Sequence, residues 1–198
     1  MRSSFGRCVL VGSLTAALLL PGTSAGAAAG QLSDPAGDPV DADTGDRVAE
    51  PRADITTASV EYQAGRITFR LQVSQPTDPM TDPGWPQEAS TAAWGVDVNN
   101  DQQPDYIAAL YVVDQQGGHP EGEVASLQED KPSCEANVSF NGGQGYQLDF
   151  DPACIGSPAS FSWGANMSYD ADPQGGDKPV ALDVVPDGDR LAGPVQPG

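Results

Sequence analysis

A strict alternation of apolar and polar residues marks one segment of the chain as a β-strand. In Arg66–Val73, the apolar residues Ile67, Phe69, Leu71 and Val73 are separated by single polar residues. A period of two puts the apolar side chains on one face of a strand and the polar side chains on the other. The segment therefore predicts a strand with one buried face and one solvated face.

Eight further segments have the length and the β-branched or aromatic composition of strands. They are 54–62, 92–98, 106–113, 124–127, 136–140, 146–150, 160–167 and 180–185. Segment 106–113 is apolar at nearly every position, which is typical of a central strand. After the first 29 residues, no segment has the period of an amphipathic helix. About nine short strands at near-regular spacing predict one all-β domain, a β-sandwich with antiparallel sheets.

Two proline-containing stretches, Gln31 to Ala53 and Pro76 to Ser90, lack strand character. We expect residues 30–53 to form an acidic N-terminal arm, 54–189 the sandwich, and 190–198 a C-terminal tail. The second stretch carries Trp85, and an exposed aromatic side chain there could stack on a sugar ring or anchor a partner. Trp85 is therefore the ligand-binding candidate. The alternative is that Trp85 covers one end of the sandwich.

The first 29 residues have the three-part pattern of a secretory signal peptide. Arg2 and Arg7 precede an apolar run over 9–20, and Ala25-Gly26-Ala27 fits a cleavage site, with 27–29 as an alternative. The apolar run has about a dozen residues, fewer than the ~20 that a membrane-spanning helix needs. The pattern predicts export, cleavage and an extracellular protein without membrane insertion.

Cys134 and Cys154 are the two cysteines that follow the signal. In an oxidising compartment, an even pair predicts a disulfide. Two alternating runs, 136–140 and 146–150, flank Asn141-Gly142-Gly143-Gln144, which is a hairpin signal. Pairing of these two runs would bring the cysteines together.

The charge balance excludes some partners. The chain has 28 acidic residues against 9 basic ones, a net charge of −19, which disfavours nucleic acid and anionic lipid. The sequence has no Gly-x-Ser-x-Gly nucleophile motif, no phosphate-binding loop and a single histidine, His119. We therefore expect no enzymatic activity, no nucleic-acid partner and a monomer.

An acidic loop between two predicted strands has the spacing of a calcium site. Asp97, Asn99, Asp101 and Asp105 stand at relative positions 1, 3, 5 and 9, as in calcium loops that connect two strands. The loop departs from an EF-hand, which carries glycine at the position of Gln102. Calcium is the predicted cofactor, and an acidic hairpin turn without an ion is the alternative.

A second acidic cluster would form if the two ends of the domain meet. Asp34 and Asp38 open the domain, Asp54 begins its first predicted strand, and Asp187 lies near its end. Chain ends often lie close together in domains, so these four carboxylates are candidate ligands for a second ion. Solvated turns are the alternative.

The order of several short motifs resembles a known family. The motifs are Asp34-Pro-Ala-Gly-Asp38, 53–60, 66–73, Trp94-Gly-Val-Asp-Val-Asn-Asn-Asp101 with 105–109, 150–156, 161–163 and 186–188. Over 34–189 the chain is similar to DOMON-like β-sandwich modules related to family-nine carbohydrate-binding modules of secreted bacterial proteins. The resemblance implies a jelly-roll-like sandwich, frequent calcium and, in some members, sugar or haem binding. The stretch 76–90 and the cysteine pair depart from the family pattern.

Together, these features predict a secreted, calcium-stabilised β-sandwich module that binds carbohydrate or a cell-surface component. The alternative is an extracellular structural or protein-interaction protein without a sugar site.

Overall fold

The fold is all-β, as the alternation along the chain predicts. A computed structural model describes residues 28–86, 89–113, 118–127, 133–172, 178–188 and 190–198. These residues form twelve antiparallel strands and one 3-10 helix. They are β1 (Ala28–Ser33), β2 (Val40–Asp41), β3 (Ile55–Gln63), β4 (Arg66–Val73), β5 (Thr91–Asp97), β6 (Tyr106–Val113), β7 (His119–Ser126), β8 (Cys134–Asn141), β9 (Gly145–Phe150), η1 (Pro152–Ile155), β10 (Phe161–Asp170), β11 (Val180–Val185) and β12 (Ala192–Val195). Residues 1–27 of the expected signal peptide lie outside the described residues.

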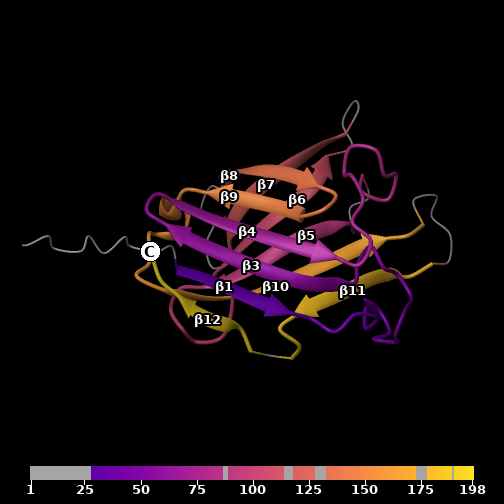
Figure 1. Ribbon diagram of the computed structural model, residues 1–198, viewed down its shortest axis with the longest axis horizontal. Helices are drawn as coiled ribbons and strands as arrows, with labels where there is room; N and C mark the ends of the chain where they lie inside the picture. Colours follow the sequence, from indigo (N-terminus) through magenta and orange to yellow (C-terminus); the bar gives the residue numbers. More distant parts are fainter. Residues whose placement is uncertain (1–27, 87–88, 114–117, 128–132, 173–177, 189) are drawn as a thin grey trace, which may run out of the picture.

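The strands form one continuous sheet that curls into two facing layers. The strand order is β1-β3-β4-β9-β8-β7-β6-β5-β10-β11-β2, and β12 pairs with β10. In Figure 1, β3, β4, β9 and β8 lie over β5, β6 and β10. The layers are joined where β7 pairs with β8, and there a Cβ on Gly122 would lie 2.6 Å from the carbonyl oxygen of Ala136. Only glycine fits at this bend without displacing the neighbouring backbone.

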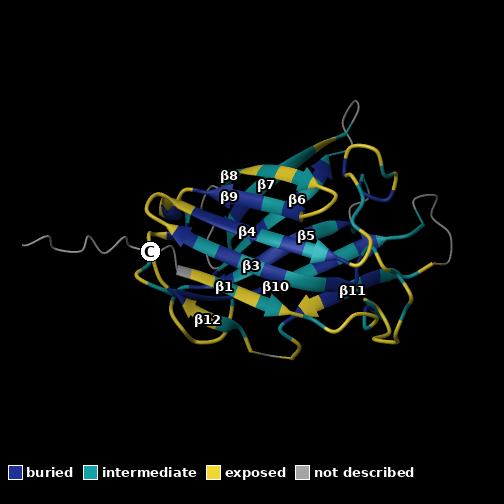
Figure 2. Cartoon of the chain, in the orientation of Figure 1, coloured by how far each residue is buried: buried dark blue, intermediate teal, exposed yellow. Residues whose placement is uncertain are grey.

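The core lies between the two layers and is rich in aromatic rings. Phe69 of β4 packs on Trp94 of β5, with ring centroids 5.6 Å apart, and on Trp163 of β10, at 5.9 Å. The apolar face predicted for β4 is buried: Ile67, Phe69 and Leu71 are fully inaccessible to solvent. Figure 2 shows buried residues alternating with partly exposed ones along β3 and β4. Burial of each such side chain stabilises the fold by about 1.5–3 kcal/mol.

The nine predicted strands correspond to β3 to β11, but three short strands were missed. β1 begins before Gln31 and ends at Ser33, and β2 lies within the stretch Gln31 to Ala53. The expectation that this stretch lacks strands is therefore wrong. β12 lies in the expected C-terminal tail. These strands are short or carry glycine, proline and small residues, so their extended conformation depends on pairing with β3, β11 and β10.

The predicted disulfide is present. Cys134, at the start of β8, is bonded to Cys154 of η1, with the two Cα atoms 5.8 Å apart. The β8–β9 hairpin brings the cysteines together, as the two alternating runs around Asn141 predict.

Loss of this bond should destabilise the protein without changing its fold. The bond closes a loop of 20 residues, and such a constraint on the unfolded chain contributes about 3 kcal/mol. We expect Cys134→Ser/Cys154→Ser to lower the free energy of unfolding by that amount in urea titrations, with an unchanged far-UV spectrum. Labelling of both thiols in the denatured, unreduced wild-type protein would contradict the pairing.

Candidate functional site

The two ends of the curled sheet meet along a seam, and acidic side chains gather there. The backbone N–H of Ile55, the first residue of β3, donates to Oδ2 of Asp183 in β11 at 2.7 Å. Asp34 directly follows β1, and its N–H donates to the carbonyl oxygen of Thr56. The seam therefore joins the β1–β3 edge of one layer to the β11–β2 edge of the other.

Three carboxylates converge at this seam. The ligand oxygens of Asp34, Asp38 and Asp183 all lie within 4.8 Å of one another, and Asp183 is 5% exposed. Oδ2 of Asp34 and Oδ1 of Asp38 are buried and have no hydrogen-bond partner among the described residues. Buried carboxylate oxygens normally have a donor or a cation beside them. These oxygens therefore fit a positively charged partner.

Burial and the crowding of negative charges perturb the titration of Asp34 and Asp183. Burial, together with the charges of Asp183, Asp38, Asp187 and Asp54, raises the pKa of Asp34 to about 7. Burial also raises the pKa of Asp183 to about 6, although hydrogen bonds from the N–H groups of Ile55 and Val184 oppose the shift. Without a cation, full ionisation of the cluster is costly near neutral pH.

The structure brings together part of the predicted second cluster and adds one residue. Asp34 and Asp38 meet as expected, and Asp183 is the member that the sequence analysis missed. Asp54 lies beside them, and its buried carboxylate accepts hydrogen bonds from the N–H of Gly37, at 2.7 Å, and from the Ser74 hydroxyl. Asp187 is exposed and contributes its charge to the cluster.

The Asp97 to Asp105 loop satisfies its carboxylates internally. Buried Asp97 accepts hydrogen bonds from the N–H groups of Asn99, Asn100 and Gln102, at 2.6–3.1 Å. Gln102 has a φ of 70°, a left-handed conformation, and it stands where an EF-hand loop carries glycine.

The opposite side of the loop is held in the same way. Asp105 accepts from the N–H groups of Val98 and Asn99 and from the Asn99 side-chain amide. Asp101 is exposed and accepts from the N–H of Gln103. Asp97, Asp101 and Asp105 do not converge as the seam carboxylates do, so metal binding by this loop stays a prediction.

The interpretation of Trp85 as an exposed ligand-binding side chain is wrong, and the alternative, that it covers one end of the sandwich, agrees with its burial. Trp85 is fully buried, its Nε1–H donates to the Thr77 hydroxyl at 3.3 Å, and its ring packs on Tyr146 with centroids 4.9 Å apart. A buried ring cannot stack on a sugar, so Trp85 covers one end of the sandwich instead.

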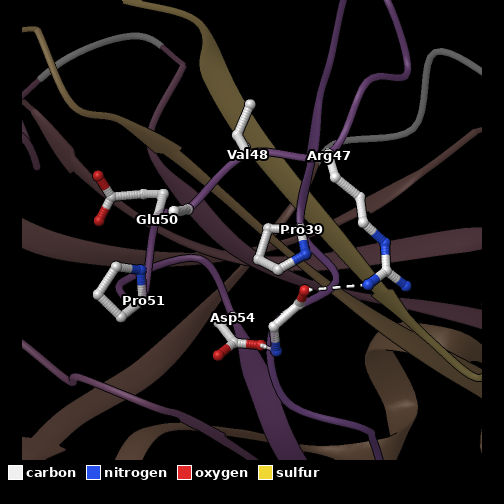
Figure 3. Close-up of a pocket in the computed structure, with 8 residues that line it drawn as sticks. Pro39, Arg47, Val48, Glu50, Pro51 and Asp54 are labelled. Carbon is white, nitrogen blue, oxygen red and sulfur yellow. Dashed lines mark hydrogen bonds between the residues drawn. The ribbon is translucent and has the colours of Figure 1, made fainter.

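A pocket of about 400 Å³ opens beside the seam. Its lining residues are Gly37, Pro39, Arg47, Val48, Ala49, Glu50, Pro51 and Asp54. Figure 3 shows Arg47 and Glu50 on opposite sides of Pro39, with Asp54 below it in this view. The Arg47 guanidinium donates to the carbonyl oxygen of Gly37 at 3.3 Å. The pocket thus shares Gly37 and Asp54 with the surroundings of the acidic cluster.

A side-chain network that the sequence analysis missed fixes one wall of the pocket. Arg52 donates to both carboxylate oxygens of Glu50, at 2.6 and 2.8 Å, and to the Tyr169 hydroxyl at 2.8 Å. The guanidinium carbon lies 4.3 Å from the centroid of the Tyr169 ring. The Tyr169 hydroxyl donates in turn to Asp82 at 2.6 Å. The negative charge of Glu50 is therefore offset outside the pocket.

Comparisons with known proteins add no family to this description. No protein-family model matches the chain, and neither the curated proteins nor the solved structures include a significant match. The resemblance to DOMON-like modules therefore stays a prediction. Within the described residues, no helix has the length and apolar character needed to cross a lipid bilayer.

Proposed function

We propose that the protein is an exported binding module whose curled sheet is closed at its seam by a divalent cation, calcium. The observation that carries the proposal is the convergence of Asp34, Asp38 and Asp183, with two buried carboxylate oxygens that have no hydrogen-bond partner in the described part of the chain. The ligand set consists of carboxylates alone, and hard oxygen ligands suit calcium, magnesium or manganese rather than zinc or copper.

Calcium suits this site better than magnesium for a geometric reason. Calcium accepts six to eight oxygen ligands in flexible arrangements, whereas magnesium demands a near-ideal octahedron and retains its waters. Asp183 belongs to β11, Asp34 directly follows β1, and Asp38 lies in the segment before β2. A cation held by all three would connect the two layers where the described strands form no ladder of backbone hydrogen bonds between them.

Export is supported by the N-terminal sequence pattern and by the disulfide. Disulfides persist in oxidising compartments. Calcium-dependent closure would stabilise the exported protein, because a cation that binds only the folded state stabilises that state by mass action.

The structure leads us to expect Ala28 as the first residue of the exported protein. Ala28 and Ala29 belong to β1 and pair with Tyr62 and Glu61 of β3. Cleavage after Ala27 keeps both pairs, whereas a signal peptide of 1–29 would remove them. The intact mass of the secreted protein distinguishes the two sites, and a chain that begins at Gly30 would contradict this expectation.

Carbohydrate is the ligand class that we favour, on the strength of the family resemblance and of the pocket beside the seam. Burial of Trp85 favours the second candidate, a structural or protein-interaction role without a sugar site. A glycan array probed in calcium and in chelator tests the first role. Calcium-dependent signals would support a sugar-binding module. Silence on the array, with a defined protein recovered by pull-down from the same source, would favour the second.

A further inference from the structure

The pocket beside the seam has a distinctive balance of charge. Its two acidic side chains already have partners, because Glu50 is paired with Arg52 and Asp54 accepts from Gly37 and Ser74. Arg47 is exposed and forms no salt bridge with any described residue. Arg47 therefore supplies an accessible positive charge in the lining, although the chain as a whole carries a net charge of −19.

From this we propose that the pocket binds the carboxylate end of an acidic sugar, a hexuronate unit, between Arg47 and the cation of the seam. The inference rests on the calcium site proposed above. A guanidinium presents paired N–H donors that match the two oxygens of a carboxylate. Calcium accepts carboxylate and hydroxyl oxygens in its variable coordination shell. A uronate supplies both kinds of oxygen from one small ring.

The apolar part of the lining suits the body of such a ligand. Pro39, Val48 and Pro51 line the pocket together with the polar groups. Compact aliphatic walls can pack against the C–H face of a sugar ring. The volume of about 400 Å³ is near the lower end of the ~300–1,000 Å³ that is usual for small-molecule sites. It suits one or two sugar units rather than a long stretch of polymer.

Electrostatics explain why the cation and the ligand would act together. Three aspartates near the pocket repel an anion when no cation is bound, so the uronate should bind well only in calcium. The Asp34 to Asp38 segment supplies both two cation ligands and, through Gly37, part of the pocket lining. Binding at one place should therefore depend on occupancy at the other.

The test is calorimetric titration of the mature wild-type protein with galacturonate and glucuronate, in calcium and in chelator. Galactose, glucose and acetate are the matched ligands that lack either the carboxylate or the ring. We expect measurable uronate binding in calcium, at least tenfold weaker binding in chelator, and at least tenfold weaker binding of galactose and of acetate. Arg47→Ala should weaken uronate binding at least tenfold, and Arg190→Ala, at an exposed arginine outside this pocket, should not.

Calcium titration of the same samples separates the two proposals. If calcium binds but uronates bind no better than neutral sugars, or if Arg47→Ala behaves like Arg190→Ala, the uronate pocket is wrong and the cation site stands. Uronate binding that is equal in calcium and chelator would overturn the role of the cation in the pocket. Failure of calcium itself to bind would overturn the cation site and this inference together.

Discussion

The mature protein should melt at a higher temperature in calcium than in chelator. A ligand that binds only the folded state at a hundredfold excess over its dissociation constant adds about 2.7 kcal/mol. For a domain of this size, that corresponds to roughly 5–11 °C. Sodium at equal ionic strength should produce little of this shift, because screening does not require converging ligands.

Asp34→Asn should destabilise the protein in calcium and stabilise it in chelator. In calcium, the substitution removes one charged ligand and should lower the melting temperature. In chelator, it removes repulsion from Asp38 and Asp183 and offers an amide donor to their carboxylates, so it should stabilise the protein by about 1–2 kcal/mol. Differential scanning fluorimetry of wild type and variant under both conditions measures the difference. Destabilisation of equal size with and without calcium would contradict a cation at the seam.

Asp101→Asn is the matched control. Asp101 is exposed, belongs to the other acidic loop, and accepts one hydrogen bond, from the N–H of Gln103, that asparagine can retain. We expect a change within about 0.5 kcal/mol in either condition. A loss of the calcium response in this variant would move the cation to the Asp97 to Asp105 loop.

The second large effect is expected at Asp97. Replacement by alanine removes a buried carboxylate and leaves the N–H groups of Asn99, Asn100 and Gln102, in a partly buried setting, without their acceptor. Hydrogen bonds to a charged group are worth ~1.5–3 kcal/mol each and are not additive, so we expect a loss of about 3–5 kcal/mol. Urea titration in calcium and in chelator should give the same loss.

A loss at Asp97 that occurs only in calcium would mean that this loop binds the ion, as its spacing predicts. If Asp97→Ala does not fold, Asp97→Asn serves as the second variant, because asparagine retains one acceptor oxygen. Its smaller loss should again be the same with and without calcium.

Most of the fold follows from local patterns in the sequence. The alternation in Arg66–Val73 and the apolar run Tyr106–Val113 identify a half-buried strand and a central strand, because side-chain direction in a strand repeats every two residues. β2 has two residues and β12 contains Gly193 and Pro194, so neither has such a pattern. Their conformation comes from pairing with distant strands, which local patterns do not encode.

The candidate site shows a similar division. Asp34 and Asp38 were predicted as ligands because they open the domain and the ends of a domain often lie close together, but Asp183 lies inside an otherwise apolar strand. Its neighbours on the same face, Ala181 and Val185, are buried. A charged residue at a buried position of a predicted strand is unusual, and that was the signal for Asp183.

Trp85 illustrates the opposite error. Its proline-rich surroundings are typical of an exposed loop, yet the ring packs on Tyr146, which lies 61 positions away in the sequence. The Arg52–Tyr169 contact is likewise long-range. Such tertiary contacts decide whether a loop residue is available to a ligand, and a single sequence does not contain them.

The most direct test of a cation at the seam is X-ray diffraction from crystals of the mature protein grown in calcium. The data are measured at a wavelength where calcium scatters anomalously. The cation site predicts one strong anomalous peak bounded by the carboxylates of Asp34, Asp38 and Asp183, which disappears in Asp34→Asn/Asp38→Asn crystals. Absence of a peak between these three residues, or a peak confined to the Asp97 to Asp105 loop, would contradict it.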